Sequence, residues 1–310
     1  MNTILYIITT FLSITTAYAL KKWFTRLGKF DAINYRSVHD TQATKTGGIA
    51  VFTTLFLMST YLYISKEELF DFSLLIPLGI MFIVGVYDDF YNADFKLKFF
   101  LQIIVAKILI DQGFIIDHFH GVLGLQEIPR LISQIFTVFV LLVIVNAINF
   151  IDGIDGMAIT ELVKVVLIVE LFSEGKTPIF FLGILTILSS IPLYYFNYKK
   201  DNKVFLGDAG SLLFGTLIAV YLFHVLGSEY TYKVDHKINK PLFTMSLIIY
   251  PLVDLLRVFI IRISNKKSPF SPDKNHIHHL LLNKSYSHFK IVSIVQLISL
   301  IFLTLVKIIA

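Results

Sequence analysis

The sequence predicts an all-α, polytopic integral membrane protein that forms one transmembrane domain over residues 1–310. The composition is 55% hydrophobic and only 16% charged, with a mean hydropathy of +0.73, which is too apolar for a soluble domain of this length. Apolar segments recur along the whole chain and leave no room for a separate soluble domain. These observations exclude an ordinary soluble enzyme and give no reason to expect a nucleic-acid partner.

Ten apolar segments predict ten membrane-spanning helices, because a helix needs about 20 apolar residues to cross the bilayer core. The first should be a permanent span rather than a signal peptide, since no Lys or Arg precedes it. The chain has no cysteine, which excludes thiol nucleophiles, disulfides and thiolate zinc sites. The spans are expected at about residues 3–20, 47–64, 72–87, 98–116, 131–150, 157–173, 178–196, 210–227, 241–262 and 289–309.

The distribution of basic residues predicts the orientation in the membrane. If the N-terminus lies outside, the cytoplasmic loops hold most of the 27 Lys and Arg residues, as basic residues prefer that side. Lys233, Lys237 and Lys240 run against this trend. We therefore expect a multi-pass protein of the inner (cytoplasmic) membrane with both termini outside and its polar site facing the cytoplasm.

Two adjacent aspartates, Asp88 and Asp89, follow directly on the third apolar segment. Adjacent carboxylates at a membrane surface repel each other unless a cation or a basic group lies between them. Lys98, at the start of the next segment, is placed to neutralise them or to hold a phosphate. The alternative is a solvated loop without a special role.

The fifth apolar segment ends in NAINFIDGIDG, residues 146–156. A spacing of three places Asn146, Asn149, Asp152 and Asp155 roughly along one side of a helical or 3₁₀ turn. The glycines between them permit close approach of a ligand or another backbone. A plain polar turn between two spans is the alternative, but it would need neither the paired asparagines nor the repeat.

Asp208 lies among small residues in LGDAGS, just before the eighth span. Backbone N–H groups at such a helix start can face an anion, while the carboxylate reaches a cation that bridges to it. Asp208 would also be ordinary as a helix N-cap.

Three histidines, His276, His278 and His279, lie within four residues of a cytoplasmic loop. A zinc site is conceivable, but adjacent histidines point apart on a helix and no cysteine completes the set. Hydrogen bonding to a phosphate or a sugar hydroxyl fits better. Arg257, three residues after Asp254 near the end of the ninth span, is placed to reach a phosphate.

Other charged residues inside the spans are expected to form local ion pairs. Lys107 and Asp111 are four residues apart, and Glu161 and Lys164 are three apart.

Together these residues gather carboxylates, amides, histidines and basic groups at one membrane face. Carboxylates that bind Mg²⁺ and bases that neutralise phosphate oxygens suit phosphoryl transfer. An enzyme built almost wholly of spans has little reason to be in the membrane unless one substrate is a lipid.

Several blocks, in order, resemble the polyprenyl-phosphate N-acetylhexosamine-1-phosphate transferases that start bacterial cell-envelope glycans. The His-Ile-His-His pattern is similar to the branch that transfers GlcNAc-1-phosphate for O-antigen or teichoic-acid synthesis. Where the family often has Pro-Thr-Pro-Arg, this chain has Gln42-Ala43-Thr44-Lys45, so the role of Lys45 stays open. The blocks are RSVHDTQATKTGGIA (36–50), YDDF with Lys98, NAINFIDGIDG, FN with VFLGDAGS (196–211), and PLVDLLRV with SPFSPDKNHIHHLL.

The resemblance implies a single catalytic domain that converts UDP-GlcNAc and undecaprenyl phosphate to undecaprenyl-diphosphate-GlcNAc and UMP. It implies Mg²⁺ as cofactor, with Mn²⁺ as an alternative. Asp88 would be the general base or lipid-phosphate partner, Asp89 would support catalysis and the metal, and Asp208 and Asn149 would hold the metal. Substrate-binding roles fall to Lys98, Asn146, Asp152, Asp155, Asn197, Arg257, His276, His278 and His279.

Several alternatives stay open at this point. The donor could instead carry GalNAc or N-acetylfucosamine, or the reaction could be phospho-N-acetylmuramoyl-pentapeptide transfer. A direct attack and a covalent aspartyl intermediate are both compatible with the residues. More distant alternatives are a lipid-linked sugar transporter and an intramembrane aspartyl protease, which pairs Tyr-Asp with Gly-Asp. A homodimer is left open.

Overall fold

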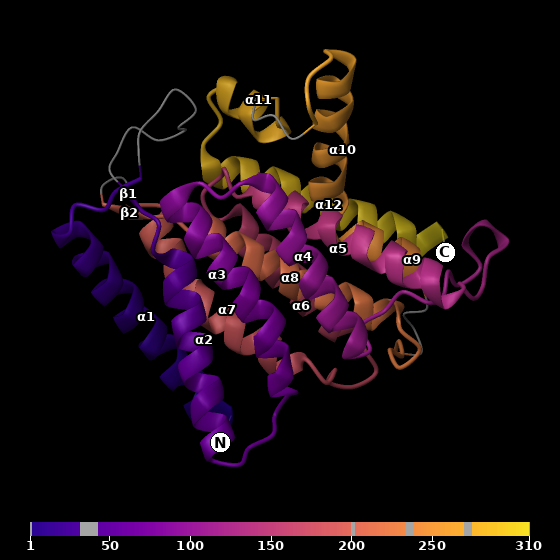
Figure 1. Ribbon diagram of the computed structural model, residues 1–310, viewed down its shortest axis with the longest axis horizontal. Helices are drawn as coiled ribbons and strands as arrows, with labels where there is room; N and C mark the ends of the chain where they lie inside the picture. The colour runs from indigo at the N-terminus through magenta and orange to yellow at the C-terminus, as the bar shows by residue number, and fades with distance from the viewer. Residues whose placement is uncertain (1, 32–42, 200–201, 234–237, 270–274, 310) are drawn as a thin grey trace.

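The computed structural model describes residues 2–31, 43–199, 202–233, 238–269 and 275–309, and its regular structure is almost entirely helical (Figure 1). The beginning of the first resembling block, residues 36–42, lies outside this part of the chain. The elements are α1 (Asn2–Arg26), β1 (Ala43–Thr44), α2 (Gly47–Ile64), η1 (Phe72–Leu74), α3 (Leu75–Tyr91), α4 (Phe95–Asp111), η2 (Val122–Gly124), α5 (Arg130–Ile151), α6 (Met157–Phe172), α7 (Phe180–Asn197), β2 (Lys203–Val204), α8 (Gly207–Leu226), α9 (Lys240–Leu247), α10 (Ile249–Ser264), α11 (Ile277–Asn283) and α12 (His288–Ile309).

The prediction of an all-α, polytopic membrane protein is confirmed. Among the described residues, seven helices are long and apolar enough to cross a membrane, or eight if α9 and α10 count as one bent span. The helices α4 and α6 have only 17 and 16 residues, fewer than the about 20 that a span needs. By length and composition, seven or eight of the ten expected spans are therefore supported among the described residues.

The expected span at 241–262 is broken into α9 and α10, which meet at an angle of 75°. Pro251, in the first turn of α10, has no N–H to donate to the carbonyl of Leu247 and so favours a break there. Figure 1 shows α10 projecting from the bundle, with α11 beside it.

The helix α8 lies at the centre of the bundle and packs against α2, α3, α5, α6 and α9. Its first turn is approached closely by glycines of two neighbouring helices. A side chain at Gly48 would collide with the backbone of Gly210, and one at Gly85 would collide with the backbone of Asp208 and Ala209. The start of α8 is therefore held by direct backbone packing.

The two ion pairs predicted inside the helices are present in the structure. Lys164 Nζ lies 2.6 Å from Glu161 Oε1, and Gln296 of α12 donates to Glu161 Oε2 at 2.8 Å, which ties α12 to α6. Lys107 and Asp111 form the other predicted ion pair on the exposed face of α4. Pairing of this kind lowers the cost of charge in an apolar bundle.

The ends of α3 and α5 and the starts of α4 and α8 meet at one end of the bundle, where Asp88, Lys98, Asn149 and Asp208 contact one another. At that end β1 pairs in parallel with β2, and Gly47 N donates to Phe205 O at 2.9 Å. The helix α12 begins beside Asp155 at this end, and Lys307 in its last turn lies over the ring of Phe172, 5.7 Å from the ring centre. The fold thus gathers polar residues from distant parts of the sequence.

Candidate active site

Asp89, at the end of α3, binds the first turn of α8. Its Oδ1 accepts a hydrogen bond from Asp208 N and its Oδ2 from Ala209 N, both at 3.0 Å. A carboxylate is stabilised at a helix N-terminus by the free N–H groups and the helix dipole. Gly207 has φ +73° and leaves no room for a side chain, which would meet Asp89 Oδ2 at 2.6 Å. Asp89 therefore fixes the helix that carries Asp208.

Lys45, whose role the sequence left open, neutralises Asp89. Its Nζ lies 3.7 Å from Asp89 Oδ1 and 3.2 Å from Asp31 Oδ1. Burial lowers the pKa of the Lys45 ammonium, but the carboxylates of Asp31 and Asp89 outweigh this effect and raise the pKa above its usual value. Lys45 is thus held as a cation beside the start of α8.

Asp88 and Asp208 share the ammonium group of Lys98. Lys98 Nζ contacts Asp88 Oδ2 and lies 3.4 Å from Asp208 Oδ2, while Ala93 N donates to Asp88 Oδ1 at 2.7 Å. These side chains come from the end of α3, the start of α4 and the start of α8. The predicted convergence of Asp88, Lys98 and Asp208 is therefore present in the structure.

Asn149, near the end of α5, orients Asp208. Its Nδ2 donates to Asp208 Oδ1 and to Ser211 Oγ, both at 2.8 Å. The Asp208 side chain remains 33% exposed, so a carboxylate held on one side is open on the other. We call the set Asp88, Asp89, Lys98, Asn149 and Asp208 the acidic cluster.

The acidic cluster fits a hard divalent cation. Carboxylate oxygens are the donors that Mg²⁺ prefers, and one oxygen each of Asp88 and Asp208 lies beside the Lys98 ammonium group, which a divalent cation could displace. Asp208 presents a partly exposed carboxylate, whereas Asn149 turns an N–H group, and not its oxygen, to Asp208.

The two aspartates of DGIDG lie in different environments. Burial raises the pKa of the Asp152 carboxyl well above its usual range, and the negative charges of Asp208 and Asp89 raise it further. Asp155 Oδ2 lies 2.9 Å from His288 Nδ1 and 2.6 Å from Lys203 Nζ. Burial alone would raise the pKa of the Asp155 carboxyl, but these two partners outweigh burial and lower the pKa. Asp152 thus belongs electrostatically with the acidic cluster, whereas Asp155 forms a structural ion pair.

Two predicted substrate-binding asparagines are engaged with other parts of the protein. Asn197 Oδ1 accepts from Gly156 N at 2.6 Å and its Nδ2 donates to Val204 O at 3.1 Å, which joins the DGIDG turn to β2. Asn146 Nδ2 donates to Gln102 Oε1 at 2.9 Å and to Leu142 O at 2.7 Å. These contacts position the backbone around the acidic cluster.

The histidines form a second group, on the loop before α11 and on its first turn. His276 Nδ1 lies 2.7 Å from Asp254 Oδ2, and Asp254 Oδ1 accepts from Ile277 N at 2.7 Å. The rings of His276 and His278 are nearly parallel, 5.3 Å between centres, and His279 lies 4.4 Å from His278. We call Asp254, His276, His278 and His279 the histidine cluster.

The histidine cluster faces the DGIDG turn. A side chain at Gly153 would meet His278 Nε2 at 3.1 Å, and the ring of His276 lies 5.5 Å from that of Phe150. Arg257 does not pair with Asp254, since it donates to the carbonyl of Asn275 and so holds the histidine loop against α10. The histidine cluster therefore contacts the DGIDG turn at Gly153, next to Asp152, whose carboxyl is influenced by the charges of the acidic cluster.

Sequence reasoning missed the partners that hold these residues. The roles of Asp254, Ser211, Lys203, His288 and Asp31 arise from contacts across large sequence separations. Asp254 carried one signal, since it is a charged residue within an apolar segment.

The fold and these contacts define a polytopic membrane protein whose carboxylates and basic groups converge at one end of the bundle. A family model described as glycosyl transferase family 4 matches residues 71–225. An undecaprenyl-phosphate α-N-acetylglucosaminyl 1-phosphate transferase of Haemophilus influenzae is 31% identical over 285 residues, covering 88% of this chain and 76% of the relative.

Two further relatives have similar names and match most of the chain. A probable undecaprenyl-phosphate N-acetylglucosaminyl 1-phosphate transferase of Bacillus subtilis is 29% identical over 289 residues, covering 91% of this chain and 78% of that protein. A decaprenyl-phosphate N-acetylglucosaminephosphotransferase of Mycobacterium tuberculosis is 28% identical over 296 residues, with 88% and 73% covered. The chain belongs to glycosyl transferase family 4, and it is an enzyme of the membrane.

Proposed function

We propose that this enzyme transfers N-acetylglucosamine-1-phosphate from UDP-GlcNAc to undecaprenyl phosphate and releases UMP, in one catalytic domain that includes residues 1–310. The names of the relatives support the sugar and the polyprenyl acceptor. The helical, apolar fold supports an acceptor that is itself a lipid. The product, undecaprenyl-diphosphate-GlcNAc, would be the first lipid-linked intermediate of a cell-envelope polysaccharide.

The acidic cluster would bind the diphosphate of the donor through Mg²⁺, or Mn²⁺ in its place. Such an ion, when bound, neutralises phosphate oxygens and polarises the phosphorus to be attacked. Asp208, oriented by Asn149 and by the turn that Asp89 caps, would be the principal ligand. Asp152 would lie at the nucleotide side, between the two clusters.

Asp88 and Lys98 would act on the acceptor. Lys98 would exchange its contact with Asp88 for the lipid phosphate, and Asp88 would accept the proton that this phosphate carries in part near neutral pH. An oxygen of the lipid phosphate would then form a bond to the sugar-linked phosphorus. The bond from that phosphorus to the bridging oxygen breaks, and UMP leaves with that oxygen.

The observation that carries this proposal is the convergence of Asp88, Lys98 and Asp208 from three helices. It is tested by incubating the purified full-length protein with UDP-GlcNAc, undecaprenyl phosphate and Mg²⁺ and measuring UMP. Release should require all three additions. UDP-GalNAc, UDP-N-acetylfucosamine and UDP-MurNAc-pentapeptide, each as sole donor, identify the sugar. Absence of UMP with every donor would contradict the proposed reaction.

A separate experiment distinguishes direct attack from a covalent aspartyl intermediate. Direct attack predicts that labelled UMP enters UDP-GlcNAc only when the lipid product is present. Exchange of label without any lipid would instead demonstrate an enzyme-bound phosphosugar.

The orientation is part of the proposal. The acidic cluster would face the cytoplasm and both termini would lie outside, as the Lys and Arg distribution predicts. Since the chain has no cysteine, single cysteines at Ser65 and Asn92 can be labelled in intact cells with a membrane-impermeant thiol reagent. The proposed orientation predicts that the reagent labels Ser65→Cys, which would lie outside. Preferential labelling of Asn92→Cys would show that the orientation is the opposite one.

A further inference from the structure

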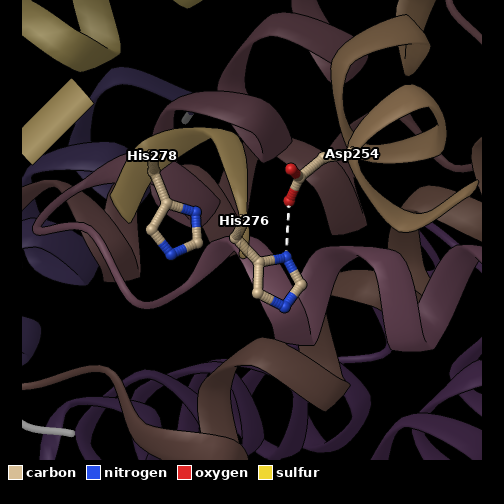
Figure 2. Close-up of side chains that lie close together, drawn as sticks. All are labelled: Asp254, His276 and His278. Atoms are coloured by element: carbon tan, nitrogen blue, oxygen red, sulfur yellow. Dashed lines mark hydrogen bonds and ion pairs between the residues drawn. The ribbon is translucent and has the colours of Figure 1, made fainter. Parts of the chain in front are cut away.

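The histidine cluster contains three side chains that can point one ligand atom each at a common centre. Asp254 comes from α10, His276 from the loop before α11 and His278 from α11, and one ligand atom of each lies within 4.8 Å of the others. Figure 2 shows Asp254 and both imidazoles around the same space, with His276 linked to the carboxylate. The chain separation explains why the histidines alone did not indicate a metal site.

His278 supplies an independent sign of a missing ligand. It is only 1% exposed, and its Nδ1 is buried without a hydrogen-bond partner among the residues that the structure describes. In Figure 2 this nitrogen lies on the side of the ring that faces His276 and Asp254. An unpaired buried nitrogen carries a desolvation penalty, which a bound group that accepts its lone pair would remove.

The donor atoms favour a transition cation over Mg²⁺. Two imidazoles and one carboxylate form the ligand set of open zinc sites, whereas Mg²⁺ prefers oxygen donors. Asp254 Oδ2 and His276 Nδ1 are 2.7 Å apart and share one proton. Two ligands of a tetrahedral Zn²⁺ lie about 3.3 Å apart, so a small outward movement would let the ion replace that proton.

We propose that Asp254, His276 and His278 bind one Zn²⁺ ion, at a site separate from the acidic cluster. The ion ties α11 to α10 and keeps the ring of His278 over Gly153 of the DGIDG turn. Three protein ligands leave a fourth position for water or a substrate oxygen. This site does not rest on the proposed reaction, because it is assembled by the protein alone.

The test measures Zn²⁺ binding to the purified full-length protein in detergent, with any affinity tag removed and no substrate added. Titration in competition with a chelator should give one Zn²⁺ per chain, and excess Mg²⁺ should not displace it. Co²⁺ in place of Zn²⁺ should show the visible absorption of a tetrahedral ion. Asp254→Asn and His278→Gln should each weaken binding by about 100-fold.

His224→Gln is the matched control, because His224 lies in the last turn of α8, far along that helix from the first turn that carries Asp208. This variant should bind Zn²⁺ as the unaltered protein does. A thermal melt shows whether each variant is folded, and only folded variants are compared. The proposal is overturned if the unaltered protein binds no stoichiometric Zn²⁺, or if Asp254→Asn and His278→Gln bind it as tightly as the control. Either result leaves the assay of UMP release unaffected.

Discussion

The acidic cluster and the histidine cluster lie at the same end of the molecule but are built in different ways. The acidic cluster lies on the ends of α3, α5 and α8, which pack in the bundle, and uses carboxylates around an ammonium group. The histidine cluster lies on a short helix and a loop held by α10, and uses imidazoles around one carboxylate. Under the proposed function, the acidic cluster would perform the chemistry and the histidine cluster would shape the donor pocket.

The largest effects are expected in the acidic cluster. Asp208→Asn and Asp88→Asn should each lower kcat by about 10³-fold or more, because a lost metal or base contact removes transition-state stabilisation. UMP release measures turnover, and a thermal melt should show that both variants remain folded. Near-normal activity of either variant would place the chemistry elsewhere.

Lys98→Gln tests whether one ammonium group serves both carboxylates. It should lower kcat by about 100-fold, since phosphate charge is then neutralised less well. Lys107→Gln is the matched control, because it removes an exposed ion pair from the same helix. Equal loss in the two variants would mean that α4 needs its lysines for stability and not for catalysis.

His278→Ala tests the role of the second cluster. It should raise KM for the UDP-sugar by about 10-fold while the Mg²⁺ concentration for half-maximal activity stays the same. The comparison between the clusters fails if this variant changes the Mg²⁺ requirement as much as Asp208→Asn does.

Asp155→Asn should have the smallest effect on kcat and act mainly on stability. At pH 7 it should lower the free energy of unfolding by roughly 2–3 kcal/mol, because Lys203 and His288 lose their partner. The folded pKa of Asp155 is lowered, so its contribution is present above the usual carboxyl pKa and is lost as the pH falls through the folded value. The difference in melting temperature between the unaltered protein and Asp155→Asn should therefore become smaller as the pH is lowered.

The sequence predicted the helical class and the residues of the acidic cluster because both depend on local patterns. Apolar runs mark helices, and Asp88, Asn149 and Asp208 stand where such runs end or begin. Seven or eight of the about ten expected spans are long and apolar enough by themselves, because α4 and α6 are short and Pro251 favours a break before α10. The roles of Asp254 and His288 could not be predicted, since they depend on how α10 and α12 approach the other helices.

The close packing of Gly48 and Gly85 against the first turn of α8 has a consequence for mutations at these positions. Gly48 and Gly85 contact backbone, not side chains, so no rotamer can relieve a larger residue there. A methyl group at either site would displace Asp208 by moving the whole turn, although neither glycine belongs to the acidic cluster. Substitutions at these two positions should therefore abolish function, while the altered protein still reaches the membrane in normal amounts.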